Sequence, residues 1–217
     1  WIKRNSGTSQ HLDGGVSYLN NLFIALGQFG TILTSSDGVT WTARTSGTTS
    51  NLWAGAYGNS TYVVVGDSGT ILTSSDGTSW TSRSAGTSSS LYGAAFGNNV
   101  FVAVGLSGTI LSSSDGSSWI SRSGAEGQLD EVTYGNGKFM AVGAAYNKFF
   151  VSGDGANWTT ISHASTTSIK DIIYTNNKFV AVGLSGHILT SNNDGGSWIL
   201  NTSGGMSYMN VVFGNGI

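Results

Sequence analysis

The sequence predicts an all-β chain folded as a β-propeller of four-stranded antiparallel blades. Tryptophans recur every 39 or 40 residues, at positions 1, 41, 80, 119, 158 and 198. The text around them is repeated, as in YVVVGDSGTILTSSDGTSW (62–80) and FVAVGLSGTILSSSDGSSW (101–119). Each repeat holds four short strand-like segments and no helical periodicity. A period near 40 residues with four strands is typical of propeller blades.

One repeat shows how the four strands of a blade follow one another. LYGAAF (91–96) supplies the innermost strand, whose small residues suit the crowded centre of a ring. The apolar VFVAV (100–104) supplies the second strand, buried between neighbouring blades. GTILSSS (108–114) supplies the third, and the outermost strand begins at Trp119. Gly-Asn-Asn (97–99) tolerates the positive φ that the first hairpin requires.

The repeats predict a single propeller domain over residues 1–217. We expect five full blades at about 11–46, 50–85, 90–123, 128–163 and 168–203. An extra outermost strand at 1–6 and an extra innermost strand at 207–217 are left over, as a split partial blade. Because propellers close by joining their end strands in one blade, we expect either a fragment of a six- or seven-bladed ring or a five-bladed ring with surplus ends.

The composition argues against several classes of function. Only 9% of the residues are charged and the net charge is −2, so no electrostatic feature points to nucleic acid or acidic lipid. Cysteine is absent, which excludes disulfides and thiolate metal sites. No apolar run approaches the roughly 18 residues of a membrane span, so we expect no membrane insertion.

A Ser-Ser-Asp-Gly-x-x-Trp motif marks the turn between the third and fourth strands. Its members are Asp37, Asp76, Asp115, Asp154 and Asp194, with Trp41, Trp80, Trp119, Trp158 and Trp198. The motif resembles the Asp-box of the sialidase-like (BNR repeat) propellers, and more closely the repeats of the photosystem II stability and assembly factor family. The usual box has one more residue between Asp and the aromatic. Only SNNDGGSW (191–198) keeps that spacing, with Asn193 in the Asp place.

Five copies of one motif indicate a structural device, because a catalytic site needs its residues once. An Asp in such a turn accepts backbone N–H bonds, and the following Gly supplies a permissive φ. We expect the tryptophan to be largely buried against the blade. A calcium loop would need several carboxylates, and each turn offers one.

No pattern of residues predicts an enzyme, a cofactor or a metal site. Equivalent arginines fall once per blade, around the circumference, and do not converge as the three arginines of sialidases do; they are Arg4, Arg44, Arg83 and Arg122. The carboxylates near 126–131 and Asp171 could serve glycoside hydrolysis, but strand-end charge explains them better. The three histidines share no metal-binding spacing.

The two rims of the propeller differ in how much the repeats vary. Turns that join strands one to two and three to four are nearly constant, whereas the opposite rim varies, and variable loops on rigid scaffolds carry recognition. Drift in unconstrained loops is the alternative. Trp53, outside the periodic series, is expected to belong to the core. The candidate ligand residues on the variable rim are Phe29, Asp67, Glu126, Tyr146, Asn147, Lys148, His163 and His187.

Three functions remain open. The resemblance to photosystem assembly factors implies a non-catalytic scaffold that binds another protein or self-assembles. A carbohydrate-binding propeller is the alternative, with sugar rings stacked on Phe29 or Tyr146. A glycoside hydrolase of the sialidase-like superfamily is the third. The low charge, the Ser/Thr richness and the resemblance suggest an extracellular or cell-surface location.

Overall fold

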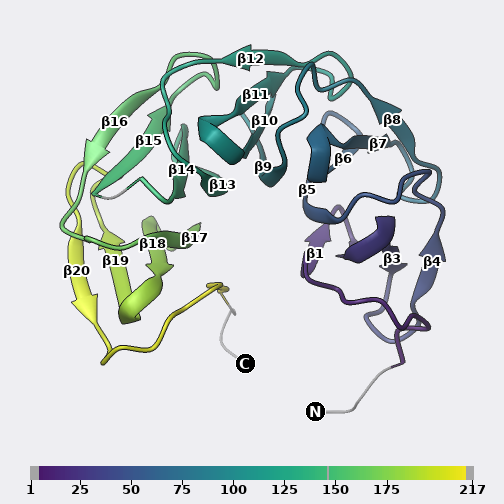
Figure 1. Cartoon of the computed structure of the whole chain (residues 1–217), viewed down its shortest axis with the longest axis horizontal. Helices are drawn as coiled ribbons and strands as arrows, with labels where there is room; N and C mark the ends of the chain where they lie inside the picture. The colour runs from purple at the N-terminus through teal and green to yellow at the C-terminus, as the bar shows by residue number, and fades with distance from the viewer. Residues whose placement is uncertain (1–4, 146, 214–217) are drawn as a thin grey trace.

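The computed structural model of the protein describes residues 5–145 and 147–213. It consists of five four-stranded antiparallel sheets arranged as blades around one axis, in an arc that is open between the first and last blades (Figure 1). The all-β propeller prediction is confirmed. In the part of the chain that is described, no helix is long and apolar enough to cross a membrane.

Strands follow one another from the axis outward in every blade. The first blade is β1 (Val16–Leu19), β2 (Leu22–Leu26), β3 (Ile32–Ser35) and β4 (Thr42–Arg44). The second is β5 (Leu52–Gly58), β6 (Thr61–Gly66), β7 (Ile71–Ser74) and β8 (Thr81–Arg83). The third is β9 (Leu91–Gly97), β10 (Val100–Gly105), β11 (Ile110–Ser113) and β12 (Ile120–Arg122). The fourth is β13 (Leu129–Gly135), β14 (Lys138–Gly143), β15 (Lys148–Ser152) and β16 (Thr159–Ser162). The fifth is β17 (Ile169–Thr175), β18 (Lys178–Gly183), β19 (His187–Ser191) and β20 (Ile199–Thr202).

Short 3₁₀ turns join the second and third strands in four of the blades. They are η1 (Gln28–Gly30), η2 (Asp67–Gly69), η3 (Leu106–Gly108) and η4 (Leu184–Gly186). Each holds a non-glycine residue in the left-handed region, which is Phe29 in η1 and a serine in the other three. These turns therefore place an unusual backbone conformation on the variable rim.

The core lies between consecutive blades rather than within one blade. Phe101 and Ala103 of β10 pack against Val63 and Val65 of β6, and all four are almost completely buried. Full burial of a valine or phenylalanine side chain contributes about 1.5–3 kcal/mol to stability. The blades approach so closely that a Cβ at Gly97 would lie 2.0 Å from the ring of Tyr134. Small residues near the axis are therefore required by packing.

The end strands expected at 1–6 and 207–217 fall partly outside the described residues, which exclude 1–4 and 214–217. Residues 5–6 and 207–213 form no strand. Past β20 the chain nevertheless turns inward toward the axis (Figure 1). The Tyr208 N–H donates to the Gly183 carbonyl at 2.9 Å, and this matches the 3.0 Å bond from the Leu52 N–H to Gly27 at the start of β5. The segment thus begins as a sixth innermost strand would.

The aspartates of the repeated turns bond the backbone of their own hairpins. Oδ1 of Asp76 accepts the N–H groups of Thr78 and Ser79 at 2.8 and 3.0 Å, and the Ser74 hydroxyl donates to it at 2.9 Å. The same contacts recur at Asp37, Asp115 and Asp154. These donors lower the pKa of the carboxyl, to about 2 for Asp37.

The fifth turn departs from this pattern. Asn193, and not Asp194, accepts the backbone bond, from the Ser197 N–H at 2.9 Å, and Asn193 also accepts from the Ser191 hydroxyl. Asp194 instead has φ 58, in the left-handed region. The extra residue in this turn moves Asp194 out of the place that Asp37 occupies. Asn193 stands in the Asp place, as the longer spacing predicted, and the grouping of Asp194 with the motif aspartates was wrong.

Each tryptophan that follows one of these turns is buried or partly buried. Trp158 is 9% exposed, whereas Trp41, Trp80, Trp119 and Trp198 are half-buried. Each precedes an outermost strand, so one part of the ring packs inward while another borders solvent. Trp158, for example, lies 6.5 Å from the ring of Phe139 between ring centroids. The indole N–H of Trp119, Trp158 and Trp198 donates to a glycine carbonyl three residues earlier.

Candidate functional site

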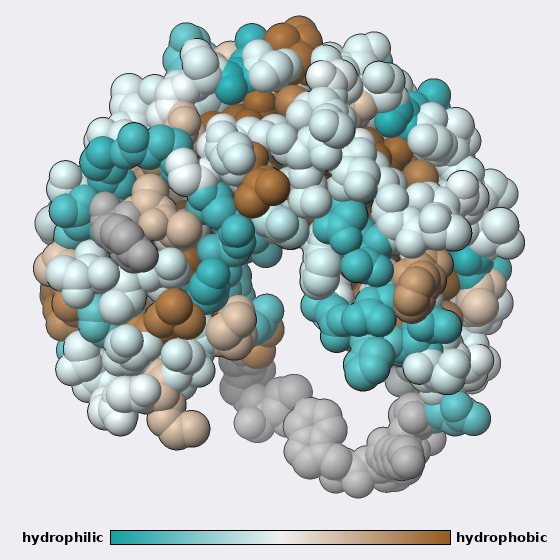
Figure 2. All heavy atoms as spheres, in the orientation of Figure 1, coloured by the Kyte–Doolittle hydropathy of each residue, from teal (hydrophilic) through white to brown (hydrophobic). Residues whose placement is uncertain are grey.

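A hollow opens at the axis of the arc, between the innermost strands of facing blades. We call it the central hollow and define it by Trp53, Tyr92, Asp130, Glu131, Lys170 and Asp171, which line its mouth. The mouth has a volume of about 470 Å³, and a second space of about 600 Å³ continues along the same strands. Figure 2 shows that hydrophilic residues border this opening on both sides.

Bulges at the start of the innermost strands place side chains at this mouth. The ladder between β5 and β6 skips one residue between Leu52 and Ala54, which leaves Trp53 without a partner. The same shift leaves Tyr92, Asp130 and Lys170 without partners at the corresponding positions of the next three blades. A bulge bends the strand and redirects the extra side chain. One repeat position therefore supplies a Trp, a Tyr, an Asp and a Lys to one opening.

The aromatic side of the hollow is fixed by a hydrogen bond. The Trp53 indole N–H donates to Oδ1 of Asp67 at 2.8 Å, and Asn51 Nδ2 donates to the other oxygen at 3.0 Å. Trp53 meets Tyr92 edge to face, with ring centroids 6.1 Å apart at 70°. The expectation that Trp53 belongs to the core was wrong: its ring is half-buried and borders the hollow.

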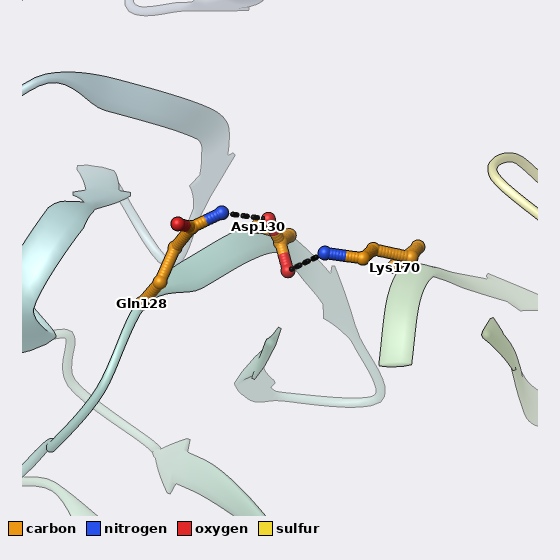
Figure 3. Close-up of polar contacts among 3 residues, drawn as sticks. All are labelled: Gln128, Asp130 and Lys170. Atoms are coloured by element: carbon orange, nitrogen blue, oxygen red, sulfur yellow. Dashed lines mark hydrogen bonds and ion pairs between the residues drawn. The ribbon is translucent and has the colours of Figure 1, made fainter. Parts of the chain in front are cut away.

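The opposite side of the hollow carries a partly buried ion pair. Lys170 Nζ lies 3.0 Å from Oδ2 of Asp130, across two neighbouring blades (Figure 3). Gln128 Nε2 donates to the other oxygen of Asp130 at 2.5 Å (Figure 3). Both oxygens of this carboxylate are therefore occupied by protein donors, and its charge is balanced by Lys170.

Two more carboxyl groups face the hollow beside this pair. Glu131 Oε1 accepts the Val132 N–H at 2.8 Å. Asp171 is 7% exposed and accepts the N–H groups of Ile172 and Val211, each at 2.7 Å. Burial, and then the charge of Asp171, raises the pKa of Glu131 to about 8. Burial also raises the pKa of Asp171 above its usual value. The sequence suggested ordinary charges at strand ends, whereas Glu131 and Asp171 border the hollow with raised pKa values.

The predicted rim residues do not form one site. Asp67 supports the hollow by holding Trp53. Glu126 and Lys148 form an exposed ion pair at 2.5 Å, and Asn147 beside them is exposed with φ 54. Phe29 is 64% exposed on the first blade. Tyr146 lies outside the described residues.

The two histidines predicted for the rim, His163 and His187, contact neighbouring residues in the fourth and fifth blades. His163 is 8% exposed, so it was wrong as a rim ligand; its ring lies 4.1 Å from that of Phe149 between centroids, and its Nδ1 accepts the Ser165 N–H. The Ser165 hydroxyl lies 2.7 Å from Nδ1 of His187. Ser165 is fully buried, so this pair offers no accessible nucleophile.

Sequence reasoning did not group the mouth residues into one site, because it looked for variation in loops. Trp53, Tyr92, Asp130 and Lys170 stand at one position of the innermost strand, and no two of these four repeats agree there. That disagreement within an otherwise repeated strand is the signal that could have found them. Across residues 5–145 and 147–213, no cluster of three or more His, Asp or Glu side chains suited to a metal is present. The arrangement is suited to binding through stacking, hydrogen bonds and charge.

Comparison with solved structures finds proteins of the same fold. A structure of YCF48 bound to D1 peptide matches with a TM-score of 0.67 and 17% identity, over 90% of this chain and 69% of that one. YCF48 from Cyanidioschyzon merolae matches with a TM-score of 0.65 and 16% identity, over 86% and 70%. The computationally designed protein Ika8 matches with a TM-score of 0.69 and 18% identity, over 95% and 67%. No family model and no curated protein matches the sequence. The protein therefore has the β-propeller fold that YCF48 also has.

Proposed function

We propose that this protein is a non-catalytic, secreted or surface-exposed β-propeller that binds a segment of another protein at the central hollow. The observation that carries the proposal is the mouth itself, where four bulged positions bring Trp53, Tyr92, Asp130 and Lys170 to one opening. Concave sites with aromatic walls and a few placed polar groups are the usual form of a ligand site.

The likeness to YCF48 supports a polypeptide as the ligand. A protein with the same fold is seen in complex with a peptide, the D1 peptide. The low charge and the Ser/Thr richness of this chain support an extracellular location. The Asp-box turns lie on the opposite rim and act as structural supports.

A library of linear peptides displayed on phage tests the proposed function. Peptides selected on the wild-type chain should lose about tenfold or more of their affinity for Trp53→Ala and for the milder Trp53→Phe, since aromatic anchors dominate such sites. Phe29→Ser, on the same rim but outside the hollow, is the matched control and should bind normally. Selected peptides that bind the Trp53 variants as well as the wild type would show that the hollow is not the site.

A second candidate function is carbohydrate binding at the first blade, and Phe29 is the observation that favours it. Phe29 has φ 54 and ψ 39, where η2, η3 and η4 hold a serine. A bulky residue in the left-handed region costs about 1–3 kcal/mol. The exposed ring borders a groove of about 750 Å³ that also contains Arg44, Ser46 and Thr48. An aromatic face with hydroxyl and guanidinium donors suits a sugar ring.

Phe29→Ser separates this role from a structural one. The variant restores the serine of the other three turns, so its unfolding midpoint should stay the same or rise while binding to an immobilised glycan panel is lost. Trp53→Phe should leave glycan binding unchanged. If Phe29→Ser and the wild type give the same glycan profile, the carbohydrate function is excluded at this groove.

A further inference from the structure

The charges around the mouth of the central hollow are unbalanced. Asp13, Asp130, Glu131 and Asp171 line it together with one cation, Lys170. Lys170 is held by Asp130, and Asp13 accepts a hydrogen bond from Gln28 Nε2 at 2.7 Å. Within the described residues, neither Glu131 nor Asp171 forms an ion pair. The opening therefore holds two carboxyl groups that no cation of the described residues pairs with.

The aromatic wall is independent of these carboxylates and points to the same ligand chemistry. Asp67 holds the Trp53 indole by its N–H, so the ring keeps one orientation beside Tyr92. The face of an indole attracts cations, and it attracts guanidinium groups by stacking as well. A fixed aromatic ring bordering the same space as two carboxyl groups favours a cationic and planar group over a neutral one.

We propose that the hollow receives an arginine side chain from the bound segment of the partner protein. This inference rests on the function proposed above and assigns its ligand chemistry. The guanidinium would stack on Trp53 and donate hydrogen bonds to Glu131, whose second oxygen has no protein donor among the described residues. Arginine suits this role better than lysine, because its planar group stacks and donates two parallel bonds at once.

The surroundings of Glu131 favour a bound cation next to its carboxyl group. Its carboxylate lies against the third residue of β9, since a Cβ at Gly93 would approach Oε1 to 2.9 Å. Glycine at this position leaves room for the carboxylate next to Tyr92. Asp171, which is buried, approaches from β17, and the partial burial of Glu131 makes charge on its carboxyl group costly without a cation nearby. An arginine from a partner would remove that cost.

The test uses capped peptides that differ in one side chain. The probes are an acetylated and amidated Gly/Ser peptide with a central arginine, the same peptide with citrulline, and the same with lysine. Binding is followed on the full chain by NMR, through the Trp53 indole N–H resonance. The arginine peptide should shift that resonance, the lysine peptide should bind more weakly, and the citrulline peptide should bind about ten- to a hundredfold more weakly.

Variants and pH extend the test. Glu131→Gln keeps the shape of the side chain and should weaken the binding of the arginine peptide about tenfold or more. Glu126→Gln, on the variable rim outside the central hollow, should leave that binding unchanged. Affinity should rise between pH 6.5 and 8.5 in the wild type as Glu131 loses its proton, and should stay flat in Glu131→Gln. The variant retains the other charged or titratable groups of the mouth, so these groups cannot account for the difference; they are Asp13, Tyr92, Asp130, Lys170 and Asp171.

The outcomes separate this inference from the function on which it rests. Equal binding of the arginine and citrulline peptides would overturn the arginine assignment, as would equal binding of the lysine peptide or an arginine peptide unaffected by Glu131→Gln. Phage-selected peptides that depend on Trp53 but contain no arginine would also overturn it, while leaving the peptide-binding function intact. Selected peptides that ignore Trp53 would remove the function and this inference together.

Discussion

The indole N–H of Trp53 donates a 2.8 Å hydrogen bond to Oδ1 of Asp67, and this bond joins the variable rim to the axis of the propeller. Asp67 starts the turn η2, and Trp53 stands at the bulge of β5. A residue in a loop thereby determines how an aromatic ring is presented at the central hollow. The first prediction concerns this pair.

Removing Asp67 should loosen Trp53 and destabilise the fold. A hydrogen bond to a charged group contributes about 1.5–3 kcal/mol, so Asp67→Ala should lower the free energy of unfolding by roughly that amount. Urea unfolding of the wild type, Asp67→Ala, Trp53→Phe and the double variant measures the coupling between the two side chains. Additive effects in this cycle would mean that the bond contributes nothing to stability.

The fifth turn should depend on Asn193 and not on Asp194. Asn193→Ala removes the acceptor of the Ser197 N–H and should cost about 1 kcal/mol of stability. Asp194→Asn keeps a residue that tolerates the left-handed region and should change stability by less than about 0.5 kcal/mol. Denaturant midpoints of the two variants decide the matter, and a larger loss in Asp194→Asn would contradict the assignment.

The repeated aspartate turns should lose their stabilising contribution in acid. Their pKa values are lowered in the folded protein, so their contribution to stability is present above the unfolded value and is lost as pH falls toward about 2. Asp76→Ala should lower the thermal midpoint at pH 7 and leave ligand binding unchanged. A variant that melts with the wild type but loses binding would show that the turn is part of a ligand site.

His163 should make the propeller acid-sensitive in a separate pH range. Burial, and then the nearby charge of His187, lowers the pKa of His163 to about 4 in the folded protein, against 6.5 for the free side chain. The unfolded chain therefore binds one more proton between pH 6.5 and 4, so stability falls as pH falls through this range. His163→Gln should remove this part of the slope of unfolding free energy against pH. An unchanged slope would show that another group titrates there.

The architecture of this protein could be predicted from its sequence, because each cue is local or repeated. The Asn and Gly residues of the first hairpins sit in the left-handed region, as at Asn98 and Asn99, and the apolar second strands are buried between blades. A period of 39 or 40 residues then follows from stacking identical units around an axis, since each blade buries its faces only against its neighbours.

The central hollow was decided by tertiary structure alone. Trp53, Tyr92, Asp130 and Lys170 are about 40 residues apart in the sequence, and only the rotation of successive blades brings them to one mouth. The direction in which these side chains point depends on a backbone bulge, and no residue type in the sequence predicts that bulge. The raised pKa of Glu131 and the burial of His163 arise in the same way, because burial depends on which blade packs against a side chain. The sequence determines the unit and its repetition, and the contacts between units determine the site.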